Sequence, residues 1–539
     1  MRMPSVARRT AWAVGAILAL AIAAAGLVIA ETTVVVTWTA GGLDAGSFGA
    51  GQAARIAADP FGNVAVVSGP AAATDLAITS YTSDGALRWR STVSPSIGAF
   101  TGDWIAAAPD GDFVAVGHNV TSTGSPIALT IVRFAPDGTL LWRVDLSRTR
   151  PAVGRLLVDS AGNAYLAFNA VGDGQDIQLH KYSPSGVLLW SQVVTTGFFA
   201  NEIASSLALS PDGADVVLTG FISGGATWIT AAFNAATGVR RWLVTAAEGL
   251  FARDIVVDGT RAYVTGQGVT GAGTPALTYW LTVVAYDRFT GKRLWRTDTK
   301  PADADNAAGL RIALAPTGNV VATGQTQRGF LDWYTVALET FGAIRWQAVR
   351  DGRLNTNEIP AAVLVLEDGT TVVTGPGGPN LPGGFIPGVT VGYDAGGTLL
   401  WEAFSRMATV WATALANGDV CATGGYDALI TCWSVSGDVP VPPPAAPEAP
   451  SALSAAAVNR SSIRLTWTNG SVGQSEVTVE RCRGSACTNF VQIAAVAGTA
   501  GSFTDTGLAR LTTYTYRVRA HNAFGDSPYS NTATARTRR

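Results

Sequence analysis

The chain is patterned along most of its length by short apolar runs that end in clusters of Gly, Asp, Asn and Ser. The run 64–67, Val-Ala-Val-Val, follows the turn-type segment 59–63, and the run 76–81 follows soon after. Runs of this length, punctuated by turn residues, are typical of strands joined by tight turns. The pattern predicts an all-β protein.

Tryptophans mark a long period in this pattern. Residues of this type recur roughly every 50 positions, at Trp38, Trp89, Trp142, Trp190, Trp242, Trp295, Trp346 and Trp401. A recurrence of this length indicates a repeat architecture, in which each unit buries its apolar faces against its neighbours.

Each unit repeats the same order of turn segments and apolar runs. An Asp-x-x-Gly-Asn segment such as 59–63 joins two runs, and a Ser-Asp-Gly segment at 83–85 precedes the strand that ends in Trp89. Glycine accepts the positive φ of such turns, and the Asp side chain bonds its own backbone, so both segments predict hairpins. Four antiparallel strands per unit form a β-propeller blade, with the tryptophan on the outermost strand packed against the next blade.

The two ends of the repeat region predict how the ring closes. After Trp401 the chain supplies three more strands up to Trp433 and lacks the fourth, whereas the segment 33–38 at the other end is a single strand that ends in Trp38. We therefore expect an eight-bladed propeller whose last blade is completed by the N-terminal strand, which removes an exposed sheet edge. A seven-bladed ring with one irregular unit is the alternative.

These motifs resemble two families of bacterial propeller repeats. The recurrent Asp-x-x-Gly-Asn-Val, Thr-Gly and Tyr-x-x-x-Gly-x-x-Leu-Trp pattern is similar to SBBP repeats, and the segment 285–295 resembles the tryptophan-docking motif of pyrroloquinoline-quinone-type (PQQ-like) propellers. The likeness covers roughly residues 31–438. It implies the fold and says almost nothing about activity.

A second domain follows a proline-rich linker. Residues 439–450 contain Pro at a density that favours an extended spacer, and residues 451–539 contain alternating strands. The segment 522–530 resembles the last loop and strand of a fibronectin type III domain. That resemblance implies a β-sandwich in which Trp467 is the buried core tryptophan and Tyr514 forms the tyrosine corner.

The first 30 residues predict export. Arginines at positions 2, 8 and 9 precede an apolar run that ends at Ala30, as in a cleavable signal peptide. We expect an extracytoplasmic protein, secreted, periplasmic or on the cell surface, and contact with a membrane only if this segment is retained as an anchor.

Cysteine spacing fits an exported protein. Cys421 and Cys432 fall on neighbouring predicted strands, and Cys482 and Cys487 bracket a short loop. Two local disulfides are expected in an oxidising compartment. A zinc site is the competing interpretation, but the four cysteines and three histidines lack zinc spacing.

Composition and motifs exclude several functions. A net charge of −2 gives no basic field for nucleic acid. The sequence holds no Gly-x-Ser-x-Gly, His-Glu-x-x-His, Walker or calcium-loop motif, and the nearest acidic group, Asp303, Asp305 and Asn306, is interpreted as a solvated loop. We expect a non-catalytic scaffold without cofactor or metal. A quinone-dependent oxidoreductase or a carbohydrate-active enzyme is the alternative.

Loop lengths predict where a ligand binds. Turns within the hairpins stay short, whereas connections between second and third strands and between units vary, and both variable sets fall on one face of the disc. Aromatic side chains on or near this face suit a protein or polysaccharide, bound by a monomer. The candidate residues are Phe100, Phe198, Phe199, Phe221, Trp228, Phe251 and Phe385. The competing interpretation is that most of them pack between loops.

Overall fold

The computed structural model describes the chain in segments. They are residues 33–40, 55–68, 75–95, 99–120, 126–147, 149–171, 175–197, 200–271, 277–351, 358–377, 388–405, 409–415, 418–424, 430–436, 447, 449–469, 476–498, 500–522 and 525–539. The predicted signal segment 1–30 and most of the linker 439–450 lie outside them. No helix within the described segments has the length and apolarity needed to cross a membrane.

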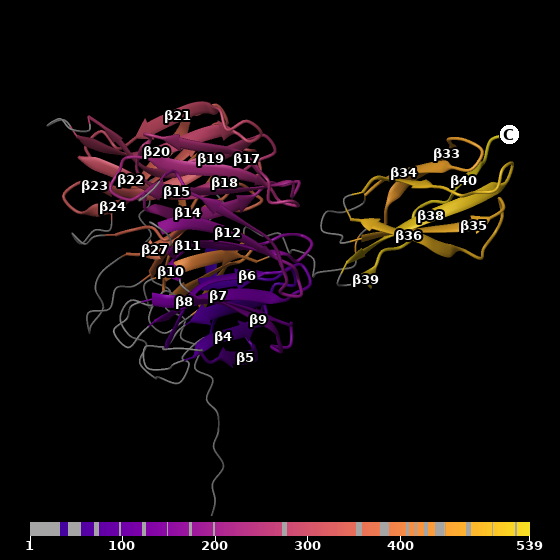
Figure 1. The fold of residues 1–539 in the computed structure, drawn as a ribbon, viewed down its shortest axis with the longest axis horizontal. Helices are drawn as coiled ribbons and strands as arrows, with labels where there is room; N and C mark the ends of the chain where they lie inside the picture. Colours follow the sequence, from indigo (N-terminus) through magenta and orange to yellow (C-terminus); the bar gives the residue numbers. More distant parts are fainter. Residues whose placement is uncertain are drawn as a thin grey trace, which may run out of the picture.

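Eight four-stranded antiparallel sheets are found in the first part of the described chain. In seven of them, four strands consecutive in sequence pair in order (Figure 1). Their strands are β2 (Arg55–Ala58), β3 (Val64–Ser68), β4 (Leu76–Tyr81), β5 (Leu87–Val93); β6 (Ala99–Ala107), β7 (Phe113–Val120), β8 (Pro126–Phe134), β9 (Leu140–Ser147); β10 (Thr149–Val158), β11 (Ala164–Val171), β12 (Gln175–Tyr182), β13 (Leu188–Val194); β14 (Glu202–Leu209), β15 (Asp215–Ile222), β16 (Trp228–Asn234), β17 (Arg240–Ala246); β18 (Gly249–Val257), β19 (Arg261–Thr270), β20 (Thr278–Asp287), β21 (Arg293–Thr299); β22 (Asn306–Leu314), β23 (Val320–Gln327), β24 (Leu331–Leu338), β25 (Ile344–Arg350); and β26 (Ala362–Val365), β27 (Thr371–Pro376), β28 (Gly388–Tyr393), β29 (Leu399–Ser405).

The eighth sheet joins the two ends of this region. Its strand order is β1-β32-β31-β30, formed by β30 (Thr409–Ala414), β31 (Val420–Gly424), β32 (Ile430–Ser436) and β1 (Thr33–Ala40). The outer pair is antiparallel, with Val35 opposite Ser434. The first strand of each sheet contacts the first strand of the next one, and β30 contacts both β26 and β2.

The hairpin turns form as the sequence predicts. The Asp59 carboxylate accepts hydrogen bonds from the backbone N–H groups of Phe61 and Asn63, at 2.9 and 2.8 Å, and Gly62 has a φ of 80°. Only glycine adopts that φ without strain. The turn's own side-chain and backbone groups therefore close the β2–β3 hairpin.

The recurring tryptophans connect neighbouring sheets. The Trp242 indole N–H donates to the carbonyl of Arg288 in the next sheet at 2.7 Å, and a β-carbon added to Gly291 would lie 2.7 Å from the Trp242 ring. The same close contact recurs in five other glycine–tryptophan pairs: Gly138 with Trp89, Gly186 with Trp142, Gly238 with Trp190, Gly342 with Trp295 and Gly397 with Trp346. Packing against the following unit is therefore confirmed for these six tryptophans.

The last part of the chain is a two-sheet β-sandwich (Figure 1). One sheet has the order β33-β34-β37, and the other has the order β36-β35-β38-β39, with β40 also paired to β38. Their bounds are β33 (Ser451–Ala457), β34 (Ile463–Thr468), β35 (Glu476–Arg483), β36 (Val491–Ala497), β37 (Ser502–Asp505), β38 (Thr513–Asn522), β39 (Gly525–Asp526) and β40 (Ala533–Arg536).

The sandwich core contains both aromatic residues predicted from the sequence. Trp467 is buried among Leu465, Val477 and Val518. The buried Tyr514 hydroxyl accepts a hydrogen bond from the backbone N–H of Ala509 at 3.1 Å, which is the tyrosine-corner interaction.

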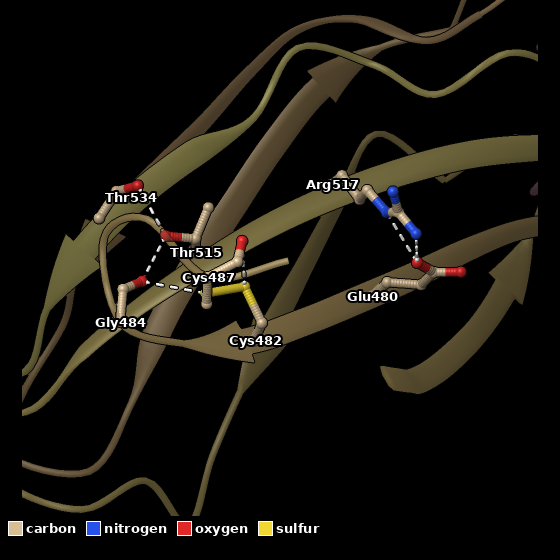
Figure 2. The surroundings of a disulfide bond; sticks show 7 residues. All are labelled: Glu480, Cys482, Gly484, Cys487, Thr515, Arg517 and Thr534. Carbon is tan, nitrogen blue, oxygen red and sulfur yellow. Dashed lines mark hydrogen bonds and ion pairs between the residues drawn. A yellow bond between two sulfur atoms is a disulfide. The ribbon is translucent and has the colours of Figure 1, made fainter. Parts of the chain in front are cut away.

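Both predicted disulfides are present. Cys421 and Cys432 are opposite each other on β31 and β32, with Cα atoms 4.0 Å apart. Cys482 and Cys487, with Cα atoms 6.0 Å apart, close the loop after β35 (Figure 2). There the Gly484 carbonyl inside the loop accepts a hydrogen bond from the Thr515 hydroxyl at 2.6 Å. The disulfide therefore closes the loop, and the hydrogen bond from Thr515 links the loop to β38.

Candidate functional site

The first strand of each of the eight sheets carries one equivalent position. This position lies four residues before the first residue of the hairpin turn that follows the strand. Arg55, for example, precedes Asp59, whose backbone N–H and C=O close the turn. We call these eight residues the central ring: Arg55, Trp104, Arg155, Ser206, Asp254, Arg311, Ala362 and Trp411. Repeat-equivalent positions on a common framework can build one site from separate strands.

A change of register explains why these side chains share a direction. In β6, β10, β14, β18, β22 and β30 the pairing shifts immediately before the central-ring residue, for example between Ala252 and Asp254. A bulge leaves one residue unpaired and re-aims the next side chain. Strict alternation from the start of these strands therefore gives the wrong face for the ring positions.

The central ring surrounds a cavity of about 250 Å³. All of its members except Ala362 line this central cavity, together with Ser205, Phe221 and Arg253. The lining residues come from seven of the eight sheets, so the cavity lies where the first strands converge.

Two tryptophans and three arginines form one wall of the central cavity. The rings of Trp104 and Trp411 meet edge to face, with centroids 5.0 Å apart. The Arg55 guanidinium lies 4.8 Å from the first ring centroid and 4.7 Å from the second, while those of Arg155 and Arg311 lie 5.6 Å from Trp104 and 5.2 Å from Trp411. Cation–π contacts hold these charges in place without neutralising them.

Positive charge exceeds negative charge among the residues that line the cavity. The single carboxylate in that described set is Asp254, which is buried and accepts hydrogen bonds from Arg155 at 3.0 Å and from the Ser206 hydroxyl at 2.7 Å. Arg311 donates to the backbone carbonyls of Ala361 and Leu310. One carboxylate therefore faces four guanidinium groups.

The uncompensated charge affects the arginine pKa values. Burial, with the repulsion of Arg311 and Arg155, lowers the pKa of Arg55 to about 10, against the attraction of Asp103. Burial likewise lowers the pKa of Arg311, although Asp254 opposes the shift. With a pKa of about 10, Arg55 stays protonated at neutral pH and keeps its positive charge in the cavity.

A second carboxylate near the cavity already has a partner. Asp103, beside Trp104, accepts from Nδ1 of His118 at 2.8 Å. Burial alone would lower the pKa of His118, but the hydrogen bond and the charge of Asp103 raise it above its ordinary value. Asp103 is therefore engaged with His118 as well as close to Arg55.

The structure corrects part of the predicted aromatic face. Phe100 and Trp228 are each 1% exposed and fill the space between adjacent sheets, so they cannot contact a ligand. Phe251 is half-buried and packs edge to face on Phe221, with the Arg253 guanidinium 4.5 Å from its ring. Phe198, Phe199 and Phe385 lie outside the described residues.

Other apolar side chains are exposed on the variable connections instead. Leu277 and Phe330, each 43% exposed, precede β20 and β24, and Ile359, 41% exposed, precedes β26. The backbone N–H of Glu358 donates to the Leu331 carbonyl at 2.7 Å. This bond joins the two connections that carry Ile359 and Phe330. We call Phe330 and Ile359 the apolar loop patch.

The acidic loop and the histidines considered in the sequence analysis make local contacts in the structure. Within the described residues, no three His, Cys, Asp or Glu side chains gather in a way that could hold a metal ion. Asp303 pairs with Arg328, whose Nε donates at 2.9 Å. His180 bonds the Tyr182 hydroxyl and packs on Phe168, and His521 bonds Asp526.

Comparison with known proteins identifies both parts of the chain. Residues 29–273 match the family model described as outer membrane protein assembly factor BamB, of the PQQ-like type, and residues 448–536 match the fibronectin type III domain. The chain is 42% identical over 103 residues to an alpha-amylase of Niallia circulans, which is 19% of this chain. It spans only 7% of that enzyme's length.

Two solved structures are similar to parts of the chain. The Dos1 propeller covers 76% of this chain and 98% of its own length at a TM-score of 0.50 and 10% identity, which shows a shared fold. An Fn3-like protein from Clostridium thermocellum is 29% identical and covers 18% of this chain and 96% of its own, at a TM-score of 0.16. Residues 29–273 are therefore similar to PQQ-like repeats of the BamB type, and residues 448–536 are similar to a fibronectin type III domain.

Proposed function

We propose that this protein is an extracytoplasmic, non-catalytic scaffold that binds another protein through its apolar loop patch. A propeller joined to a fibronectin type III domain suggests an interaction role. The two disulfides are compatible with an oxidising compartment. The single observation that carries the proposal is that exposed Phe330 and Ile359 lie on two variable connections whose backbones are hydrogen-bonded to each other.

The chemistry of the patch favours a protein surface over a polysaccharide. Isoleucine and phenylalanine offer no hydrogen-bonding group to sugar hydroxyls, whereas they fit the apolar centre of a protein interface. The patch also stands on a framework of paired strands, which limits the entropy lost when a partner binds.

We further propose that the eight sheets form one ring, closed by β1. The pairing of β1 with β32 and the contacts of β30 with β2 and β26 support closure.

A disulfide crosslink between β1 and β32 tests this closure. Thr33 is opposite Ser436 in the pairing of these two strands. The double variant Thr33→Cys/Ser436→Cys is expected to form a disulfide, detected by peptide mapping without reducing agent. Thr33→Cys/Thr431→Cys is the control, because Thr431 is opposite Thr39, and absence of the first crosslink would contradict closure.

Photo-crosslinking tests the binding surface. A photoreactive phenylalanine analogue at position 330, in protein expressed in its own cells, is expected to give a protein adduct identified by mass spectrometry. Ile359→Glu should reduce this adduct at least tenfold, because a buried carboxylate is costly at an apolar interface.

Phe341 provides a matched control. It is 70% exposed on the turn between β24 and β25, at the opposite end of β24 from Phe330. The analogue at position 341 should give no protein adduct. Equal adducts at both positions, or none at 330, would refute the proposed surface, and an adduct with carbohydrate alone would refute a protein partner.

A further inference from the structure

The side chains that line the central cavity carry an excess of positive charge, which suits a bound anion. Arg55, Arg155, Arg253 and Arg311 line it, and Asp254 is the one carboxylate among the described lining residues. Counting Asp103 as a second negative charge still leaves an excess of two positive charges. Like charges in a poorly solvated space repel one another strongly, so the arrangement is costly unless a further anion is present.

Among the four arginines that line the cavity, Arg253 is the one that the described residues satisfy least. Within the described part of the chain it has no hydrogen bond or ion pair, and its guanidinium lies over the Phe251 ring. Burial lowers its pKa. A purely structural arginine is usually held by carboxylates or carbonyl oxygens, as Arg133 is by Asp112 and Gly162.

We propose that the central cavity binds a small oxyanion with two negative charges, of the phosphate, sulfate or dicarboxylate class. Arg253 supplies the guanidinium that is free to bind it, and Arg55, Arg155 and Arg311 supply the surrounding positive field. The cavity of about 250 Å³ has room for roughly eight water molecules, enough for such an anion with part of its hydration. This site is separate from the apolar loop patch and does not depend on it.

Calorimetric titration of the purified full chain tests the site. After dialysis into a buffer without multivalent anions, inorganic phosphate, sodium sulfate and succinate are titrated separately. At least one is expected to bind with a Kd below about 1 mM and to raise Tm by mass action. The three arms separate a tetrahedral oxyanion from a dicarboxylate.

Two substitutions locate the bound anion. Arg253→Gln is expected to weaken binding at least tenfold, and Arg253→Lys, which keeps the charge, to weaken it less. Arg240→Gln, at an exposed arginine on the outer strand β17, should leave binding unchanged. Near-ultraviolet circular dichroism checks that each variant is folded.

Three outcomes overturn the inference. They are the failure of phosphate, sulfate and succinate to bind, binding that Arg253→Gln leaves intact, and binding that Arg240→Gln weakens equally. None of these outcomes bears on crosslinking at position 330, so the two proposals fail independently.

Discussion

Replacing Trp242 with alanine is expected to lower the free energy of unfolding by about 3–5 kcal/mol. The side chain is buried among Val217, Ile255 and Val264, and its indole N–H donates to the Arg288 carbonyl in the next sheet. The substitution removes apolar contacts between two sheets and leaves a cavity at their junction. Urea unfolding of the full chain, followed by far-ultraviolet circular dichroism, measures the loss.

The partner glycine provides a second test of the same contact. Gly291 has a φ of 71°, and a β-carbon there would meet the Trp242 ring. Gly291→Ala should therefore lower the free energy of unfolding. The double variant Trp242→Ala/Gly291→Ala should lower it by less than the sum of the two single effects. Phe341→Ala, at an exposed side chain, should change stability by less than about 0.5 kcal/mol. Strict additivity of the first two variants would show that Trp242 does not act through this contact.

The periodicity of the sequence was sufficient to predict the units and their junctions. Turn residues such as Asp59 and Gly62 determine local backbone geometry by themselves, so the hairpins could be predicted without the structure. The period of Trp242 and its relatives placed them at equivalent positions, and the space beside each glycine accounts for their packing.

The central cavity could not be predicted in the same way. Bulges in the first strands interrupt the two-residue alternation, so sequence alone did not show that Arg155 and Asp254 point to the same place. The signal that could have found them is the fixed distance of four residues from the turn. Phe100 and Trp228 were assigned to the binding face because they lie near loops, but nearness along the chain does not determine burial between stacked sheets.

Buried ion pairs were also missed, since each depends on residues that are separated in sequence. Arg133, on β8, is 1% exposed and donates to Asp112 at 2.6 Å and to the carbonyl of Gly162 in the next sheet at 2.7 Å. Its third contact is Asp110, at 2.8 Å, whose side chain is 57% exposed. The sequence shows three ordinary charged residues, and only the fold shows which of them are buried together.

Asp112→Ala is expected to lower the free energy of unfolding by about 3–5 kcal/mol, because it leaves the buried Arg133 guanidinium without its buried counter-ion. Asp110→Ala removes an exposed partner and should lower it by no more than about 1 kcal/mol. Urea unfolding at pH 7 measures both changes in the full chain.

The double variant Arg133→Met/Asp112→Ala distinguishes the cost of an isolated charge from a loss of packing. Methionine fills much of the same volume without charge, so the double variant should be more stable than Asp112→Ala alone. If the large effect of Asp112→Ala comes from lost packing instead, Arg133→Met will add to it. Similar losses in Asp112→Ala and Asp110→Ala would show that burial does not make the two carboxylates different, since they contact the same guanidinium and differ in exposure.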